Sequence, residues 1–312
     1  MPEYRIIVNP TSGRGMGGKS IPSIRQLLEA AGLEFDIVQT ERPWHAVELA
    51  ARAVADGCRV VVAAGGDGTA NEVLNGLMRA RQSGGGRTAA LGLISVGRGN
   101  DFAYGVDVPS GVEAGCRLLV EDRRITIDVG RVSGGLHPEG RYFGNGVGIG
   151  FDAVVGFEAL KLRPLSGYAS YLVAALKTIF LYFRAPKVRV ELDDGERTLN
   201  ALMVSTMNGR RLGGGFHMAP NGDIGDGLFD VSLVEQVSRA RVLALITHFT
   251  RGTQAGEPDV HTSRSAKVRV TALSGVLPAH ADGETLCVDG TQLELQNLPR
   301  QIEVITSRGQ AA

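Results

Sequence analysis

The sequence predicts two fold classes in succession: a doubly wound, parallel α/β domain and then a mainly-β domain. In the first 124 residues, apolar runs of strand composition alternate with segments of helical periodicity, which is typical of a parallel sheet with helices on both faces. Two of these runs end in glycine-rich loops that each contain an aspartate. After Ile125, short strand-like runs separated by turn residues predominate. A chain of 312 residues is long enough for two such domains.

The elements of the first part follow one another at regular intervals. We expect strands at 6–8, 35–39, 60–64 and 91–96, and helices at 20–31, 45–55, 69–81 and 111–121. The change of pattern near 122–125 places the domain boundary there. The domains expected from the sequence are therefore residues 1–124 and 125–290.

The second part is expected to be mainly strands. Their ranges are 126–132, 188–192, 201–207, 228–234, 267–271 and 303–305, and Asp193-Asp194-Gly195 is a hairpin signal. Two helices interrupt them, at 168–183 and 240–250. The first of these is the longest apolar stretch, but it contains Lys177 and falls short of the ~20 residues that span a bilayer, so we expect a core helix.

The bulk composition excludes some classes of protein. Lys plus Arg and Asp plus Glu both number 33, so the basic surplus typical of nucleic-acid binders is missing, and we expect no nucleic-acid partner. The three cysteines are far apart and suit a reducing compartment. The first residues run directly into a strand without the pattern of a signal peptide, so we expect a cytoplasmic protein.

The first glycine-rich loop, Gly65–Thr69, joins a buried strand to a helix. Adjacent glycines let the backbone turn tightly and bring its N–H groups close to a ligand, and the helix adds the positive end of its dipole. Asp67 lies in the middle of this proposed phosphate-binding loop, and a carboxylate there is explained if it binds a metal ion or accepts a proton. The alternative is an ordinary strand-to-helix turn, since Gly-Asp-Gly is common in turns.

The second loop, Gly97–Phe102, also follows an apolar run. Two such loops suit the carboxyl edge of one parallel sheet, where ligands of α/β folds bind. Asp101 beside Asp67 would give Mg²⁺ a site shared with the phosphates of a substrate. The alternative for Asn100 and Asp101 is again a simple turn.

These two loops and four further blocks resemble the diacylglycerol kinase catalytic domain and its bacterial lipid-kinase relatives. The blocks keep the family's order and span nearly the whole chain: Ile7–Gly13, Phe143–Asp152, Ala219–Asp230 and Asp282–Glu284. The resemblance implies that the second domain is a β-sandwich and that residues 291–312 return to the first domain. We expect the active site in the cleft between the two parts.

The resemblance implies an enzyme that transfers the γ-phosphoryl group of ATP, with Mg²⁺, to a lipid hydroxyl, most simply that of diacylglycerol. It makes Glu284 the catalytic base, with Asp67 and Asp101 as further catalytic residues. The residues that it places on the nucleotide are Asn9, Thr40, Gly65, Gly66, Asp67, Gly68, Thr69, Asn71, Glu72, Arg98 and Asn100. It also implies a structural Mg²⁺ held by Asp226 and the backbone oxygens of Asp223 and Leu228; on spacing alone, that loop is a solvated turn.

Arg98 departs from the pattern of the resembled family. Many relatives carry threonine or serine at Arg98, and an arginine there could contact phosphate directly or change how the nucleotide is held.

His280, Asp282 and Glu284 alternate, so in an extended strand they would share one face. The alternative is a surface hairpin with Asp282-Gly283 as its turn.

One motif points elsewhere. Gly13–Ser20 matches the P-loop pattern G-x-x-x-x-G-K-S. However, Asn9–Ser12 separate the strand from the first glycine, and no apolar strand ends directly in a clear Walker B aspartate. Arg14 and Lys19 could still lie near nucleotide phosphates.

Two rival functions stay open at this point. One is an NAD kinase or phosphofructokinase-like enzyme, which also carries a GGDG loop; the Gly99–Phe102 block and the β-rich second part argue against it. The other is a non-catalytic nucleotide- or lipid-binding regulator. For a lipid kinase we expect peripheral association with a membrane surface, with Lys161, Arg163, Arg210 and Arg211 as candidate headgroup contacts. The identity of the lipid and the presence of a homodimer stay open.

Overall fold

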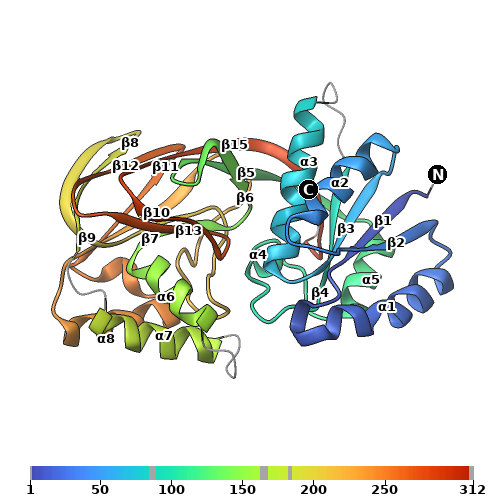
Figure 1. Ribbon diagram of the computed structural model, residues 1–312, viewed down its shortest axis with the longest axis horizontal. Coiled ribbons are helices and arrows are strands. Elements are labelled where there is room, and N and C mark those ends of the chain that lie inside the picture. The colour runs from blue at the N-terminus through green and yellow to red at the C-terminus, as the bar shows by residue number, and fades with distance from the viewer. Residues whose placement is uncertain (1, 84–88, 162–167, 182–184, 309–312) are drawn as a thin grey trace. The chain divides into compact units, whose positions relative to one another are not determined.

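The computed structural model of the chain describes residues 2–83, 89–161, 168–181 and 185–308. The chain divides into two compact units, Met1–Val129 with Arg300–Ala312, and Gly130–Pro299. It passes from the first unit to the second within strand β5 (Arg124–Gly134) and returns within β15 (Gln292–Ile305) (Figure 1). The sequence placed the boundary a few residues earlier, at the start of β5, because the chain crosses between the units inside one continuous strand.

The first unit contains the predicted parallel sheet. Its strands are β1 (Tyr4–Val8), β2 (Phe35–Gln39), β3 (Val60–Gly65) and β4 (Ala90–Ser95), in the order β2-β1-β3-β4. The end of β15 adds a further parallel strand beside β4, where Val304 pairs with Leu91. Strands β3 and β4 are buried along their whole length, which explains their continuous apolar sequences.

Helices cover both faces of this sheet, as the alternating pattern predicted. Helix α1 (Ser12–Ala30) packs with α5 (Val112–Glu121) on one face, and α2 (His45–Ala55) packs with α3 (Asp67–Ser83) on the other (Figure 1). A short helix, α4 (Asp101–Gly105), follows the second glycine-rich loop. Both α1 and α3 begin earlier than predicted. In α1, Gly13, Arg14 and Gly15 have left-handed φ angles of 58°, 60° and 89°, so regular helix starts only after Gly15.

The second unit is a β-sandwich, in agreement with the fold that the resemblance implied. One layer has the strand order β14-β13-β7-β9-β10-β11, and the other contains β6, β5, β15, β12 and β8. The strands not yet given are β6 (His137–Phe143), β7 (Gly146–Gly150), β8 (Lys187–Leu192), β9 (Gly195–Met207), β10 (Phe229–Glu235), β11 (Val260–Ser265), β12 (Lys267–Ser274), β13 (Leu277–Ala281) and β14 (Glu284–Gly290). The predicted hairpin turn lies between β8 and β9.

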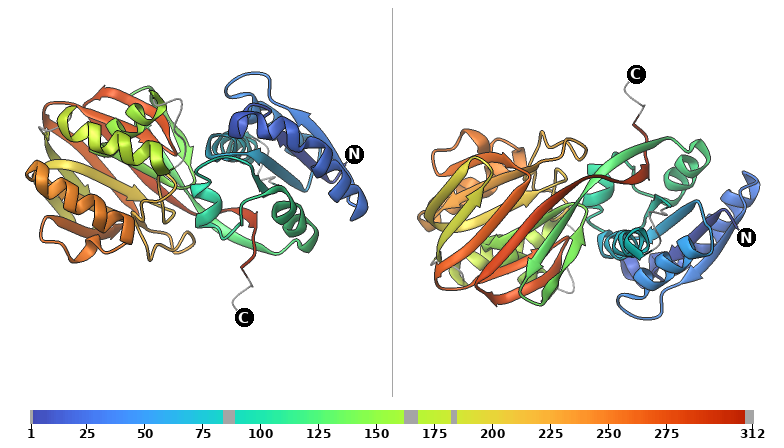
Figure 2. Two further views of the ribbon diagram at one scale, coloured as in Figure 1. Left: turned by 90° about the horizontal axis from the view of Figure 1, so that it is seen from below. Right: turned by 90° about the horizontal axis from the view of Figure 1, so that it is seen from above.

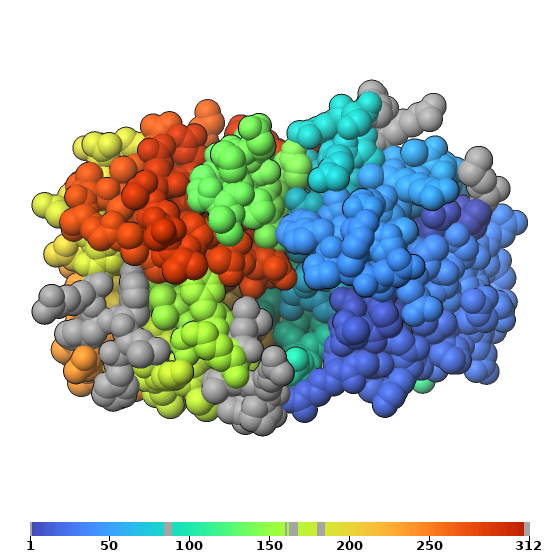
Figure 3. Space-filling model, viewed as in Figure 1, coloured from blue at the N-terminus to red at the C-terminus, as the bar shows by residue number. Residues whose placement is uncertain are grey.

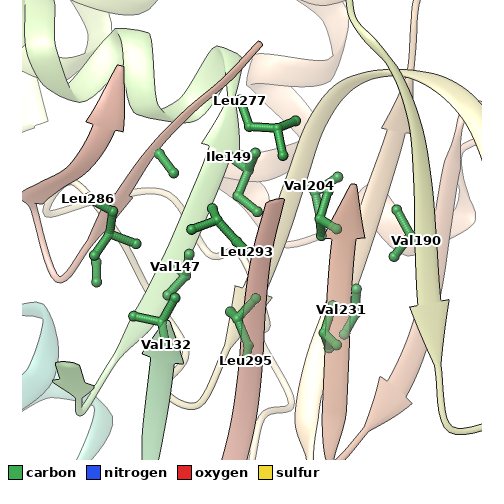
Figure 4. Close-up of a cluster of buried hydrophobic side chains, with 14 of the residues drawn as sticks. Val132, Val147, Ile149, Val190, Val204, Val231, Leu277, Leu286, Leu293 and Leu295 are labelled. Atoms are coloured by element: carbon green, nitrogen blue, oxygen red, sulfur yellow. The ribbon is translucent and has the colours of Figure 1, made fainter. Parts of the chain in front are cut away.

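Apolar side chains from both layers fill the sandwich. Val147 and Ile149 of β7, Val190 of β8, and Leu293 and Leu295 of β15 belong to this cluster (Figure 4). All five are at most 2% exposed. The two layers therefore share one apolar interior.

Three helices cover the outer face of the layer that contains β9. They are α6 (Phe151–Lys161), α7 (Tyr168–Leu181) and α8 (Arg239–Arg251). The ribbons of these helices lie on one side of the sandwich (Figure 2). Leu202 and Met203 of β9 form a second apolar cluster with the helices. Helix α7 is the helix predicted at 168–183, but only one of its sides is buried, because Val173 and Leu176 are exposed. Residues 182–183 of that prediction lie outside the described residues. Among the described residues, no helix is long and apolar enough to cross a membrane.

Candidate active site

The two glycine-rich loops of the first unit lie side by side. Strands β3 and β4 are in parallel register, so that Gly65 pairs with Ser95 at their carboxyl ends. The backbone N–H of Val96 donates to the carbonyl of Gly65, at 2.9 Å. A Cβ added to Gly97 would lie 2.4 Å from the Cα of Gly66, so only glycine fits there. The expected meeting of the two loops is confirmed.

Two carboxylates converge on the second loop. Asp67 begins helix α3, and its Oδ1 accepts a hydrogen bond from the backbone N–H of Phe102, at 3.0 Å. A Cβ added to Gly99 would lie 2.9 Å from Asp67 Oδ2 and 3.5 Å from Asp101 Oδ2. Both carboxylates therefore line one small region, which suits a hard cation that also binds phosphate oxygens.

The amide of Asn100 shapes the same region. Its Nδ2 donates to the carbonyl of Gly97, at 3.1 Å, and to Ser110 Oγ, at 3.2 Å, while its backbone has a left-handed φ of 53°. Its Oδ1 is buried without a hydrogen-bond partner among the described residues. A buried acceptor in this state fits a site that takes a further donor, such as a ligand or a water on a metal ion.

The other residues expected on the nucleotide divide into two groups. Asn9 follows β1, Thr40 follows β2, and exposed Arg98 follows β4, so all three lie at the same carboxyl edge as the Gly65–Thr69 loop. Asn71 and Glu72 lie further along α3 and have structural partners. Asn71 Oδ1 accepts from Asn75 at 3.2 Å, and Glu72 Oε2 accepts from the backbone N–H of Ala46, in the first turn of α2, at 3.1 Å.

The P-loop-like segment does not present its residues as a P-loop requires. The hydroxyl of Ser20 would have to reach Mg²⁺, but Ser20 is buried and its Oγ donates to the carbonyl of Gly17, at 2.7 Å. Gly17 itself packs against the backbone of Asn9. Lys19 is exposed. The segment is therefore an irregular start of α1.

In the second unit, the Asp282-Gly283 turn joins β13 to β14. Asp282 is 9% exposed, and its carboxylate accepts hydrogen bonds from the backbone N–H groups of Gly144, Asn145 and Gly146, at 2.8, 3.0 and 2.9 Å. Its left-handed φ of 49° turns the chain. Asp282 therefore fixes the turn between β6 and β7, and this engagement argues against it as a base.

The expectation that His280, Asp282 and Glu284 share one strand face is wrong. The left-handed turn at Asp282-Gly283 interrupts the strand, so Glu284 lies on β14, where it pairs with Ala281 of β13. Glu284 is exposed, whereas His280 is buried. The hairpin that was the alternative interpretation is the structure observed.

His280 connects this turn to helix α6. Its Nδ1 accepts a hydrogen bond from the backbone N–H of Gly283, at 3.3 Å. The proton of a neutral imidazole is then on Nε2, which lies 3.6 Å from Asp152 Oδ2. That carboxylate oxygen is buried and has no hydrogen-bond partner among the described residues. Sequence reasoning gave Asp152 no role; its position beside the Gly146–Gly150 strand was the available signal.

The acidic loop before β10 has its carboxylates already engaged. Asp226 Oδ1 accepts from the backbone N–H of Leu228, at 3.0 Å, and Oδ2 forms an ion pair with Arg264 of β11. Asp223 Oδ1 accepts from the N–H of Gly225, at 3.1 Å. Burial, and then the charge of Asp223, raise the pKa of Asp230 nearby. A structural Mg²⁺ at Asp226 would have to displace Arg264, a residue that the sequence gave no reason to connect with this loop.

The basic residues expected to contact lipid headgroups differ in their exposure to solvent. Lys161 is exposed at the end of α6, whereas Arg210 and Arg211 are half-buried in the loop after β9. Arg163 lies outside the described residues.

Comparison with known proteins matches both parts of the chain to known domain families. The family model described as the diacylglycerol kinase catalytic domain matches residues 3–132, and that of the YegS C-terminal NAD kinase beta sandwich-like domain matches residues 145–306. A diacylglycerol kinase of Staphylococcus saprophyticus is 29% identical over 305 residues, which cover 97% of this chain and 94% of the relative. A diacylglycerol kinase of Staphylococcus haemolyticus is 29% identical over 307 residues, which cover 97% and 88%.

Solved structures share the fold. A diacylglycerol kinase of Bacillus anthracis str. Sterne has a TM-score of 0.74 at 21% identity, with 98% of this chain and 97% of that chain covered. An NAD kinase of Archaeoglobus fulgidus in complex with ATP has a TM-score of 0.54 at 14% identity, with 98% and 94% covered. With both of its domains matched in order, the chain belongs to the diacylglycerol kinase catalytic domain family and is a kinase.

Proposed function

We propose that this kinase transfers the γ-phosphoryl group of ATP to the hydroxyl of a lipid, with diacylglycerol as the acceptor and phosphatidic acid as the product. The observation that carries the proposal is the pairing of the two glycine-rich loops with Asp67 and Asp101 between them. Relatives that match nearly the whole chain and bear the name diacylglycerol kinase support the choice of acceptor.

The first unit supplies the nucleotide-binding half of the chemistry. Backbone N–H groups of the Gly65–Thr69 loop and the N-terminus of α3 favour the negative charge of phosphates. Asp67 and Asp101 would hold Mg²⁺, which offsets the charge of the phosphate oxygens when it is bound. Because phosphoryl transfer needs little covalent help from the protein, positioning and electrostatic stabilisation are the main contributions of these residues.

The second unit supplies the base. Glu284 accepts the proton of the lipid hydroxyl as the hydroxyl oxygen bonds to the γ-phosphorus. The bond between that phosphorus and the bridging oxygen breaks at the same time, and ADP leaves. The hydrogen bond from the N–H of Gly283 to His280 holds the turn that precedes Glu284.

The remaining expectations belong to the same proposal. A structural Mg²⁺ at Asp226 requires that Arg264 move away, so we derive no step from it. Reversible contact with a membrane follows from a lipid acceptor. A cytoplasmic location and a homodimer remain parts of the proposal that the choice of acceptor does not decide.

An assay that follows transfer of the γ-phosphoryl group of ATP separates the proposed lipid kinase from a small-molecule kinase and from a regulator. Purified chain, [γ-³²P]ATP and Mg²⁺ are incubated with diacylglycerol in mixed micelles, with NAD, and with fructose 6-phosphate. We expect label only in the lipid product. Label in NADP or a sugar bisphosphate would replace the proposed function with a small-molecule kinase, and ATP binding without turnover on any acceptor would indicate a regulator.

A further inference from the structure

We propose that the second unit docks on anionic lipid surfaces through the outer face of α7 and α8. We call this face the α7–α8 surface and define it by Tyr168, Val173, Leu176, Lys177 and Leu243. The inference rests on the proposed function, because a kinase of long-chain lipids must reach its acceptor in a bilayer. It places the contact on a helical layer, next to which only Lys161 of the basic residues expected from the sequence is used.

Helix α7 has one buried and one exposed side. Ala174, Ala175 and Ile179 pack into the cluster beneath the helix. Val173 and Leu176 lie on the opposite side, three residues apart, and are 42% and 43% exposed. Large apolar side chains that stay exposed side by side on a helix indicate an interaction surface.

Helix α8 extends this face. Its Val242, Leu245 and Phe249 are buried, whereas Leu243 is 47% exposed. The two helices contact each other and lie side by side on the face turned to the viewer in Figure 2, left. In Figure 3, α7 is the yellow-green surface at the lower edge.

The charges of these helices have one sign. Helices α7 and α8 contain no aspartate or glutamate, while Lys177, Arg239 and Arg251 are exposed on them. The whole chain has a net charge of zero, so this positive layer is a local feature. Basic residues next to apolar ones are the composition of surfaces that bind anionic lipid headgroups.

A buried carboxylate anchors two of the cations. Glu158 of α6 is 6% exposed and forms ion pairs with Lys161, at 2.5 Å, and Lys177, at 2.6 Å. Hydrogen bonds from Lys161 and then Lys177 lower the pKa of Glu158, so its carboxylate stays ionised and pairs with both ammonium groups. The lysine side chains are 66% and 51% exposed, so each also faces solvent.

Tyr168 adds an aromatic side chain to the α7–α8 surface. Its ring packs against Phe216, with 5.5 Å between ring centroids, and the residue remains 38% exposed. Tyrosine is enriched where membranes meet water. With 14 residues, α7 is shorter than the ~20 residues that cross a bilayer, so it would lie in the plane of the interface.

Charge also decides between a membrane and a second copy of this chain. Two α7–α8 surfaces facing each other would bring Lys177 and Arg251 of one chain toward the same cations of the other, which is unfavourable. Anionic headgroups complement these cations, and the acyl region accommodates Val173, Leu176 and Leu243.

The test measures vesicle binding and activity separately. The full chain is sedimented with vesicles of phosphatidylcholine alone and of phosphatidylcholine with 30% phosphatidylglycerol. We expect binding only to the anionic vesicles. The double variant Val173→Asp/Leu176→Asp should bind them roughly tenfold more weakly or worse, because apolar stabilisation scales with the area buried. Lys177→Ala should weaken binding about fivefold, which corresponds to ~1 kcal/mol per basic residue.

The matched control is Leu273→Asp, which changes an equally exposed leucine, 48%, on β12. It should bind vesicles as the natural chain does. Leu243→Asp repeats the test on α8 in case the double variant has a lowered melting temperature. Equal vesicle binding by the natural chain, the double variant and Leu243→Asp would overturn the proposal. So would an equal loss in the control, or a change of oligomeric state with unchanged vesicle binding.

Activity distinguishes this inference from the proposed function. Val173→Asp/Leu176→Asp should lose activity on diacylglycerol embedded in anionic vesicles in proportion to its loss of binding. It should keep the natural kcat on water-soluble, short-chain diacylglycerol. If the natural chain phosphorylates neither acceptor, the proposed function fails, while sedimentation still decides the docking surface.

Discussion

The carboxylate of Asp67 accepts a hydrogen bond from the backbone N–H of Phe102, 3.0 Å away, and so links the loop after β3 to the loop after β4. These residues are 35 positions apart in the sequence, but the parallel register of β3 and β4 brings their carboxyl ends together. The bond uses one carboxylate oxygen. The other, Oδ2, faces Gly99 and the carboxylate of Asp101.

The first prediction concerns Asp67. Asp67→Asn keeps an oxygen that can accept from Phe102 but removes the negative charge, so the fold should persist while kcat falls by roughly 10²–10³-fold. Lys19→Ala should change kcat by less than this, because Lys19 is an exposed side chain on α1. Steady-state kinetics and a thermal melt of each variant give the answer. Loss of ATP binding in Lys19→Ala with normal turnover in Asp67→Asn would restore the P-loop interpretation.

The second prediction concerns the close approach of the two loops. Gly97→Ala places a Cβ 2.4 Å from the Cα of Gly66, and because both partners are backbone, the loops must separate. We expect a loss of about 1–3 kcal/mol in the free energy of unfolding, as for other overpacked sites, and weaker ATP binding. Gly256→Ala is the control, because a Cβ there meets nothing within 4 Å. Similar denaturation curves for the two variants would contradict a tight contact.

Local sequence patterns were sufficient to predict the first half of the site. A strand such as 60–65 and the glycines after it are local signals, and a parallel sheet always gathers such ends at one edge. The two glycine-rich loops and their meeting at one edge of the sheet could therefore be found without the structure. The roles of Asn71 and Glu72 could not, because their partners Asn75 and Ala46 depend on how α3 packs.

The second half depends on contacts that local patterns do not show. Alternation of His280, Asp282 and Glu284 suggested one strand face, but a left-handed φ at Asp282 depends on the three N–H groups of residues 144–146, far away in the sequence. Helix α6 was missed because the apolar residues of Phe151–Lys161 are spread around the helix and show no helical periodicity. Arg264 reaches Asp226 only because β10 and β11 pair across the sheet.

The third prediction tests the metal loop. If Mg²⁺ binds at Asp226, the melting temperature should be higher with Mg²⁺ than with a chelator, and Asp226→Ala should abolish that difference. Arg264→Gln should enlarge it, because it removes the cation that now pairs with Asp226. Melts of the three proteins in both buffers decide the matter. An identical metal-dependent shift in all three would place the responsible ion elsewhere, and no shift in any of them would show that this loop binds no Mg²⁺.

The fourth prediction separates two neighbouring carboxylates. Glu284→Gln keeps the size of an exposed side chain but cannot accept a proton at neutral pH, so kcat should fall by about 10²–10⁴-fold with little change in ATP affinity or melting temperature. Asp282→Asn should instead lower the melting temperature more than it lowers kcat. It replaces one acceptor oxygen by an amide that cannot accept from the backbone N–H groups of Gly144, Asn145 and Gly146, so the main effect should be a loss of stability. Kinetics measured well below the melting temperature of each variant separate the two effects. A Glu284→Gln enzyme with natural kcat would exclude Glu284 as the base; because Asp282 is committed to the turn, Asp101 would then be the carboxylate to test.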